Sequence, residues 1–193
     1  MAVRVQGVAS PERAALATGA TADGARERLE ALAAAGLATG RSAALCGFSL
    51  TPAGLERLEE LLAREGLRGD ARLSDAYDRF LLVNERVLKA CSDWQVRRDG
   101  RAEVPNDHTD PRYDASVIDR LCEAHARAGS CLEAFWSRAP RFGVYRSRLD
   151  DCVRRLGDGD RSAFTTPLAE SYHTVWFELH QDLLLTLGAT REG

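Results

Sequence analysis

The sequence predicts a mainly α-helical protein in which an N-terminal helix-turn-helix with a short β-wing precedes a C-terminal helical bundle. Two short, well-capped helices occur before residue 37, and a strand–turn–strand pattern follows them. From Leu73 onward, apolar residues recur with the 3.6-residue period of amphipathic helices. A chain of 193 residues with ordinary globular composition fits a small domain over 1–68 and a larger helical domain over 69–193.

The helix-turn-helix is predicted from helix start and stop signals. Ser10 is a typical N-cap residue, Pro11 suits the first helical position because it lacks an amide hydrogen, and Gly19 can end the helix in a left-handed turn. Thr21 then offers a second N-cap, and the apolar repeat that follows runs until Gly36. We therefore expect two helices joined by a tight turn.

The wing is predicted from two short strand candidates, residues 37–39 and 45–50, on either side of a turn over residues 40–44. Thr51 and Pro52 then provide the cap and the first position of another helix. Residues 1–7 leave room for only a short helix ahead of this arrangement.

The segments "LEALAAAGLATG" and "GFSLTPAGLERLEELL" resemble the winged-helix domain of the MarR-type regulators, over about the first third of the chain. The resemblance implies a two-fold dimer bound to double-stranded DNA, with helices outside the winged helix forming the dimer and effectors lodged between the two regions. The positions that match the DNA contacts of the family are Thr21, Arg26 and Arg28 on the recognition helix and Arg41 and Ser42 at the wing.

The charge of this region leaves a second hypothesis open. If Ala25, Leu29 and Leu32 face inward, the outward positions include the carboxylates of Asp23, Glu27 and Glu30. Residues 1–70 contain eight Arg against nine Asp and Glu, so the electrostatic attraction to phosphate is small. A winged helix that contacts another protein fits this charge as well.

The rest of the chain predicts a four-helix bundle. Its helices are expected over 73–98, 114–138, 142–156 and 166–188. The segment 97–113 is the longest expected loop, with His108 between two aspartates, and loops of this length are more often functional than decorative.

Several polar side chains fall on or beside the apolar faces of the predicted bundle helices, and buried polar groups need partners. They either bond one another across the core or line a pocket walled by aromatic rings. The candidate ligand-binding residues are Asn84, Trp94, Gln95, His125, Tyr172, His173, Trp176 and His180, with His125 as the central candidate.

Metal and cofactor chemistry are not predicted. His173 and His180 are seven residues apart, about 10.5 Å along a helix, which is too far for one ion. The sequence has no phosphate-cradling glycine loop and no nucleophile motif, so we assign no catalytic residue. Five cysteines without a C-x-x-C pair predict reduced thiols. With no signal peptide and no apolar run of membrane-spanning length, we expect a cytoplasmic protein that makes no membrane contact.

Three functions follow from these observations. The first is a MarR-like DNA-binding transcriptional regulator, a homodimer whose bundle takes up a small-molecule effector. The second is an accessory or interaction protein that uses the winged helix to contact a partner protein. The third is a small-molecule enzyme built on a pocket at His125.

Overall fold

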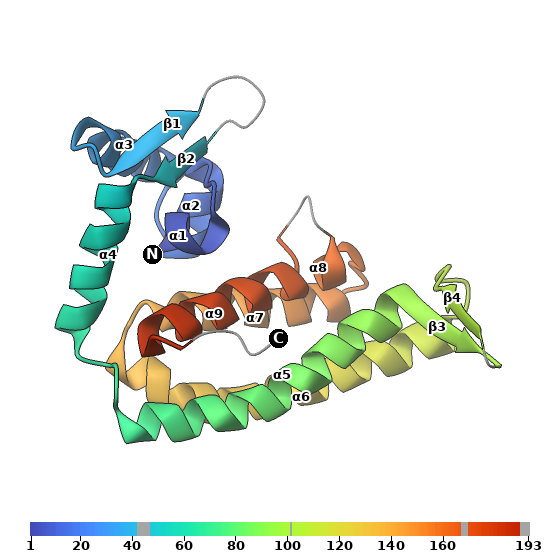
Figure 1. The fold of residues 1–193 in the computed structure, drawn as a ribbon. Coiled ribbons are helices and arrows are strands. Elements are labelled where there is room, and N and C mark those ends of the chain that lie inside the picture. The colour runs from blue at the N-terminus through green and yellow to red at the C-terminus, as the bar shows by residue number, and fades with distance from the viewer. Residues whose placement is uncertain (42–46, 101, 167–169, 190–193) are drawn as a thin grey trace. The chain divides into compact units, whose positions relative to one another are not determined.

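The fold was analysed in a computed structural model that describes residues 1–41, 47–100, 102–166 and 170–189 (Figure 1). These residues are mainly helical, which confirms the mainly α-helical part of the predicted fold class. The chain divides into two compact units, the first made of Met1–Asp70 with Glu178–Gly193 and the second of Ala71–Phe177. The predicted boundary after residue 68 lies close to the first division, whereas the last sixteen residues cluster with the N-terminal unit.

The first unit contains two short helices in tandem, a hairpin and a further helix. Its elements before residue 71 are α1 (Ala2–Gln6), α2 (Pro11–Thr18), α3 (Ala22–Ala34), β1 (Ala38–Arg41), β2 (Gly47–Leu50) and α4 (Pro52–Glu65). The side chains of Ser10, Thr21 and Thr51 accept backbone amides at the starts of α2, α3 and α4, as the sequence predicts. Gly19 ends α2 in a left-handed conformation, with φ of 68°.

The hairpin of the first unit gains a third backbone segment. β1 and β2 pair antiparallel, with Ala38 opposite Leu50. On the other edge of β2, Ala9 and Phe48 exchange two backbone hydrogen bonds, of 2.9 and 2.8 Å. The connection between α1 and α2 is therefore tied to the hairpin.

A small core holds these elements together. Its buried members are Val3, Ala9, Ala14, Ala15, Ala25 and Leu29, and Phe48 and Leu50 pack against them. The start of α4 approaches the end of α3 closely, because the Thr51 hydroxyl donates to the carbonyl of Gly36 at 2.7 Å. A Cβ on Gly54 would lie 1.9 Å from the carbonyl oxygen of Leu37, so only glycine fits here.

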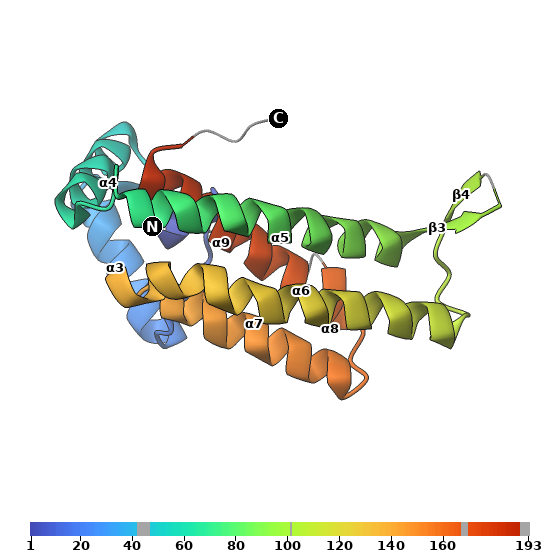
Figure 2. The same ribbon diagram turned by 90° about the horizontal axis from the view of Figure 1, so that it is seen from below.

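The second unit is built on two long helices. Its elements are α5 (Ala71–Gln95), β3 (Val96–Asp99), β4 (Ala102–Pro105), α6 (Pro111–Arg138), α7 (Phe142–Gly157), α8 (Ser162–Thr165) and the start of α9 (Tyr172–Leu187). Figure 2 shows α5 and α6 running side by side along their length, with α7 next to α6. Four helices were expected in this region, and α5, α6 and α7 lie close to the predicted ranges, whereas α9 begins at Tyr172 and not at residue 166. Among the described residues, no helix combines the length and the apolar character needed to cross a membrane.

The segment expected to be a long loop contains a β-hairpin. β3 and β4 pair antiparallel, with Val96 opposite Pro105. Gly100 occupies the turn with φ of 62°, a conformation that glycine adopts without strain. Asp-Gly between two short strands is a common hairpin signal. The strands were not predicted because the residues around this turn are mostly polar and show no apolar alternation.

Candidate functional site

The outward surface of α3 is the first candidate site. Ala25 and Leu29 are buried and Leu32 is half-buried, so the helix faces the core as predicted. The exposed positions carry both signs of charge, and they are Asp23, Arg26, Glu27, Arg28 and Glu30. This surface is mixed in charge.

The residues predicted to contact DNA differ in whether their side chains are already engaged in contacts within the protein. Thr21 caps α3 and stays exposed, while Arg26 pairs with Glu12 at 3.3 Å. Arg28 has no ion pair among the residues described, so its charge is available to a partner. Ser42 and the side chain of Arg41 lie outside the described part of the chain.

The bundle interior contains a chain of polar and aromatic contacts across four helices. Trp176 of α9 donates its indole N–H to Asn84 of α5 at 2.9 Å and stacks on Tyr172, with ring centroids 5.9 Å apart. The Tyr172 hydroxyl lies 3.3 Å from Nδ1 of His125 on α6, and Nε2 of His125 lies 3.0 Å from Asp150 on α7. Asn84 and His125 therefore both have hydrogen-bond partners within the bundle, and Trp176 and Tyr172 connect them.

His125 is a neutral link in this network. Burial lowers the pKa of its imidazole, and Arg146 lowers it further, whereas the Asp150 carboxylate raises it. Burial has the larger effect because Asp150 is 55% exposed and its charge is screened by water. A neutral ring with the proton on Nε2 donates to Asp150 and accepts from Tyr172, so both nitrogens are engaged.

A small cavity of about 210 Å³ opens beside His125, between α6 and α7. The Arg146 guanidinium lies 4.7 Å from the ring centroid of Trp136, and both side chains line the cavity. The Trp136 indole N–H is shielded from solvent and has no acceptor among the described residues. The cavity therefore offers one unused donor near His125.

The other predicted ligand residues do not join this network. Trp94 lies ten residues from Asn84 on α5, about 15 Å away along the helix, and Gln95 beside it is exposed. His173 is half-buried, and burial lowers its pKa. His180 is buried in the part of α9 that clusters with the first unit. The predicted set therefore does not form a single pocket.

A second polar cluster holds the segment that follows the β3–β4 hairpin. Asp114 is 2% exposed and accepts from Nδ2 of Asn106 at 3.0 Å, while Nδ1 of His108 lies 3.1 Å from it. Asn106 also donates to the backbone carbonyl of Trp94. The Trp94 ring lies between His108 and Phe164, with both centroids 4.5 Å away. This cluster fixes the hairpin to the ends of α5 and α6.

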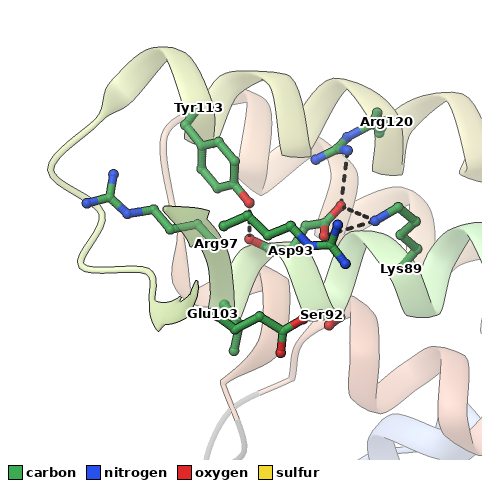
Figure 3. Close-up of a pocket in the computed structure, with 9 residues that line it drawn as sticks. Lys89, Ser92, Asp93, Arg97, Glu103, Tyr113 and Arg120 are labelled. Carbon is green, nitrogen blue, oxygen red and sulfur yellow. Dashed lines mark hydrogen bonds and ion pairs between the residues drawn. The ribbon is translucent and has the colours of Figure 1, made fainter. Parts of the chain in front are cut away.

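A pocket with a volume of about 460 Å³ lies beside this hairpin. Figure 3 shows Lys89 and Arg120 converging on the carboxylate of Asp93, at 3.1 and 3.0 Å. The Tyr113 hydroxyl donates to the backbone carbonyl of Asp93 at 2.9 Å. The remaining lining residues are Ser92, Val96, Arg97, Arg98 and Glu103.

This pocket was not predicted from the sequence. The spacing of Lys89 and Asp93 is that of an ordinary helical ion pair, and Arg97 and Arg98 fell in an expected loop. The hairpin begins directly after α5, so Arg97 and Arg98 line the same pocket as Lys89 and Asp93. The turn signal at Asp99-Gly100 could have revealed the arrangement.

Comparisons of the chain with protein-family models, with curated proteins and with solved structures find no significant match. Function is therefore inferred from the chain's own residues.

Proposed function

We propose that residues 1–68 form a winged helix-turn-helix that binds double-stranded DNA, and that the protein is a MarR-like transcriptional regulator. The observation that carries this proposal is the exposed face of α3, the second helix of a tandem pair that is followed directly by a hairpin. In helix-turn-helix proteins the second helix enters the major groove. The pairing of Ala9 with Phe48 supports it by adding the short third strand that a winged helix contains.

The charge of α3 determines the kind of contact that we propose. Arg28 is exposed and unpaired among the described residues, and the Thr21 hydroxyl lies at the N-terminus of the helix, where a phosphate is well placed. Asp23, Glu27 and Glu30 repel phosphate, but a carboxylate can accept a hydrogen bond from a cytosine amino group. We therefore expect DNA binding with a weak dependence on salt and a stronger dependence on sequence.

We further propose that the protein acts as a homodimer through α5. Leu81, Leu82 and Leu88 of this helix are 36%, 64% and 43% exposed, which is much apolar surface for one helix. A two-fold dimer would present two copies of α3 to a palindromic site. Gel filtration of the wild type and of Leu82→Glu tests this step, and a wild-type protein that elutes as a monomer contradicts it.

The DNA proposal is tested by selecting bound sequences from a random duplex library and measuring their affinity by fluorescence anisotropy. Arg28→Gln should weaken binding by about 1–3 kcal/mol, because a groove contact of an arginine is lost. Arg64→Gln is the matched control, since Arg64 is an exposed arginine on α4 and belongs to no ion pair among the described residues. Selection of no preferred sequence contradicts the proposal.

A second candidate function is contact with a partner protein. The acidic residues Asp23, Glu27 and Glu30 favour it, since they would face a basic surface as readily as a groove. The same measurements separate the two candidates, because a protein-contact module shows neither sequence preference nor loss of DNA affinity in Arg28→Gln. No comparable observation favours an enzyme at His125, where both ring nitrogens are already bonded.

A further inference from the structure

We propose that the pocket between α5, β3 and α6 binds a small organic dianion, a dicarboxylate or a phosphate monoester. The proposal goes beyond DNA binding and does not rest on it, because every lining residue belongs to the second unit. It stands on three properties of the pocket, which are its charge, its fixed walls and its size.

The pocket carries more positive than negative charge. Four cationic side chains line it, against the two carboxylates of Asp93 and Glu103. The cationic residues are Lys89, Arg97, Arg98 and Arg120. The surplus of two positive charges matches a dianion.

The internal ion pairs leave the arginines of β3 largely unneutralised. Asp93 already accepts from both Lys89 and Arg120, so its charge is shared. Arg97 has only a long contact of 3.8 Å to Asp107, and its shielded Nε has no acceptor among the described residues. Arg98 has no ion pair or hydrogen bond to any side chain that the structure describes. A guanidinium group without an acidic partner can form charge-assisted hydrogen bonds to a bound anion.

The positive surface continues beyond the pocket. A second hollow of about 190 Å³ shares Lys89, Asp93 and Arg120 with it. Arg86, Arg127 and the carboxylate of Glu123 also line this hollow, and neither arginine forms an ion pair in the described part of the chain. A ligand longer than inorganic phosphate could therefore meet cationic groups at both ends, which is why we infer an organic dianion.

The walls of the pocket are fixed before a ligand arrives. The Tyr113 hydroxyl ties the start of α6 to Asp93 on α5 at 2.9 Å. Asn106 ties the end of the hairpin to α5, since its backbone amide donates to the carbonyl of Gln95 at 2.8 Å and its side chain to that of Trp94 at 3.1 Å. These bonds fix the backbone that carries the arginines, so less of the chain has to become ordered when a ligand binds.

The size of the pocket favours a small molecule over a polyanion. Its volume of about 460 Å³ lies within the range of small-molecule sites. A nucleic acid would instead be expected to use a long positive track across the surface.

Isothermal titration calorimetry of the full-length protein tests the proposal with succinate and glycerol 3-phosphate, with glycerol as the uncharged control. We expect both dianions to bind and glycerol not to bind. Arg98→Gln and Lys89→Gln should each weaken binding by about tenfold or more, since a charge-assisted bond to the ligand is lost. Arg112→Gln is the control variant, because Arg112 is an exposed arginine on the first turn of α6 outside the pocket lining.

Two results would overturn the proposal. One is a wild-type protein that binds neither dianion, or binds both as tightly after Arg98→Gln as before. The other is a pocket that binds only a polyanion such as heparin or single-stranded DNA. No duplex is present in this titration, so its failure is independent of any failure of the proposed DNA binding. The side chain of Arg98 makes no hydrogen bond or ion pair among the described residues, so Arg98→Gln is expected to fold normally, which thermal unfolding checks.

Discussion

The indole N–H of Trp176 donates to the side-chain oxygen of Asn84 at 2.9 Å, joining α9 to α5 across 92 residues of sequence. Both side chains are buried, with 1% and 9% of the residue exposed. The Trp176 ring also stacks on Phe80 and Tyr172, at 5.0 and 5.9 Å between centroids. This hydrogen bond is thus the polar part of an aromatic contact that fixes α9 on α5.

Replacing Asn84 should destabilise the protein because it leaves a buried donor without an acceptor. We expect Asn84→Ala to lower the free energy of unfolding by about 1–3 kcal/mol. Urea denaturation followed by tryptophan fluorescence measures the change. Glu85→Ala is the control, since Glu85 is the exposed neighbour on the same helix, and it should change the free energy by less than about 0.5 kcal/mol. Equal effects of the two substitutions would contradict the role of the hydrogen bond.

Gly54 should tolerate no side chain. A Cβ at this position would lie 1.9 Å from the carbonyl oxygen of Leu37, so Gly54→Ala forces α4 away from the end of α3. We expect a loss of about 1–3 kcal/mol or more in the free energy of unfolding. The control is Gly129→Ala in the interior of α6, where nothing lies within 4 Å of the added carbon. That variant should gain about 0.5–1 kcal/mol, because alanine favours a helix over glycine.

If Gly54→Ala unfolds at the same urea concentration as the wild type, the close approach of α4 and Leu37 is not a feature of the protein in solution. Gly129→Ala adds the same single carbon without a close contact, so the comparison separates the steric clash at Gly54 from the general effect of replacing glycine by alanine.

The elements of this fold that could be predicted are those set by local signals. Ser10, Thr21 and Thr51 cap the helices that the sequence places after them, because a cap depends on only a few neighbouring residues. The β3–β4 hairpin was missed because its strands are short and polar, with a buried fraction too small to produce an alternating pattern. An amphipathic helix can therefore be recognised from its apolar repeat, whereas a solvent-exposed hairpin can be recognised only from the residues of its turn.

The candidate sites were less predictable, since contacts between distant segments decide them. Periodicity placed Asn84, His125 and Trp176 on inward faces, and the structure links them through Tyr172. It could not show that Asp150, an exposed residue on α7, bonds to His125. Nor could it show that Asp114 is buried against His108, because a helix-start aspartate normally remains in solvent.

Two cysteines of the second unit, Cys91 and Cys152, should be unreactive in the folded protein. Burial raises the pKa of Cys91 to about 12 and, together with the nearby Glu170 carboxylate, that of Cys152 to about 11. Since the thiolate is the reactive form, both should be alkylated by iodoacetamide far more slowly than a free thiol. Cys122 is half-buried and should react before them. Peptide mass spectrometry after timed alkylation gives the order, and labelling of Cys91 as early as Cys122 would contradict the packing of α5.

Stability should fall as the pH drops below the ordinary histidine range. Burial lowers the pKa of both His125 and His173, so the folded protein takes up a proton on these residues at lower pH than the unfolded chain, whose histidines titrate near about pH 6.5. Between those values the unfolded state binds more protons, and the free energy of unfolding rises with pH. The stabilisation is fully present above about pH 6.5 and is lost as the pH falls through the lowered pKa of the folded state.

Urea denaturation at several pH values between about pH 5 and pH 7 measures this slope, above the range where most carboxylates titrate. His125→Gln should reduce the slope, His173→Gln should reduce it independently, and the double variant should remove both contributions. His125→Gln keeps a side-chain group that can donate a hydrogen bond to Asp150. The variant therefore removes the titratable group while retaining a donor at this position. A wild-type slope that survives in the double variant would show that other groups cause it. A slope of the opposite sign would mean that the attraction of Asp150 for a charged His125 outweighs the effect of burial.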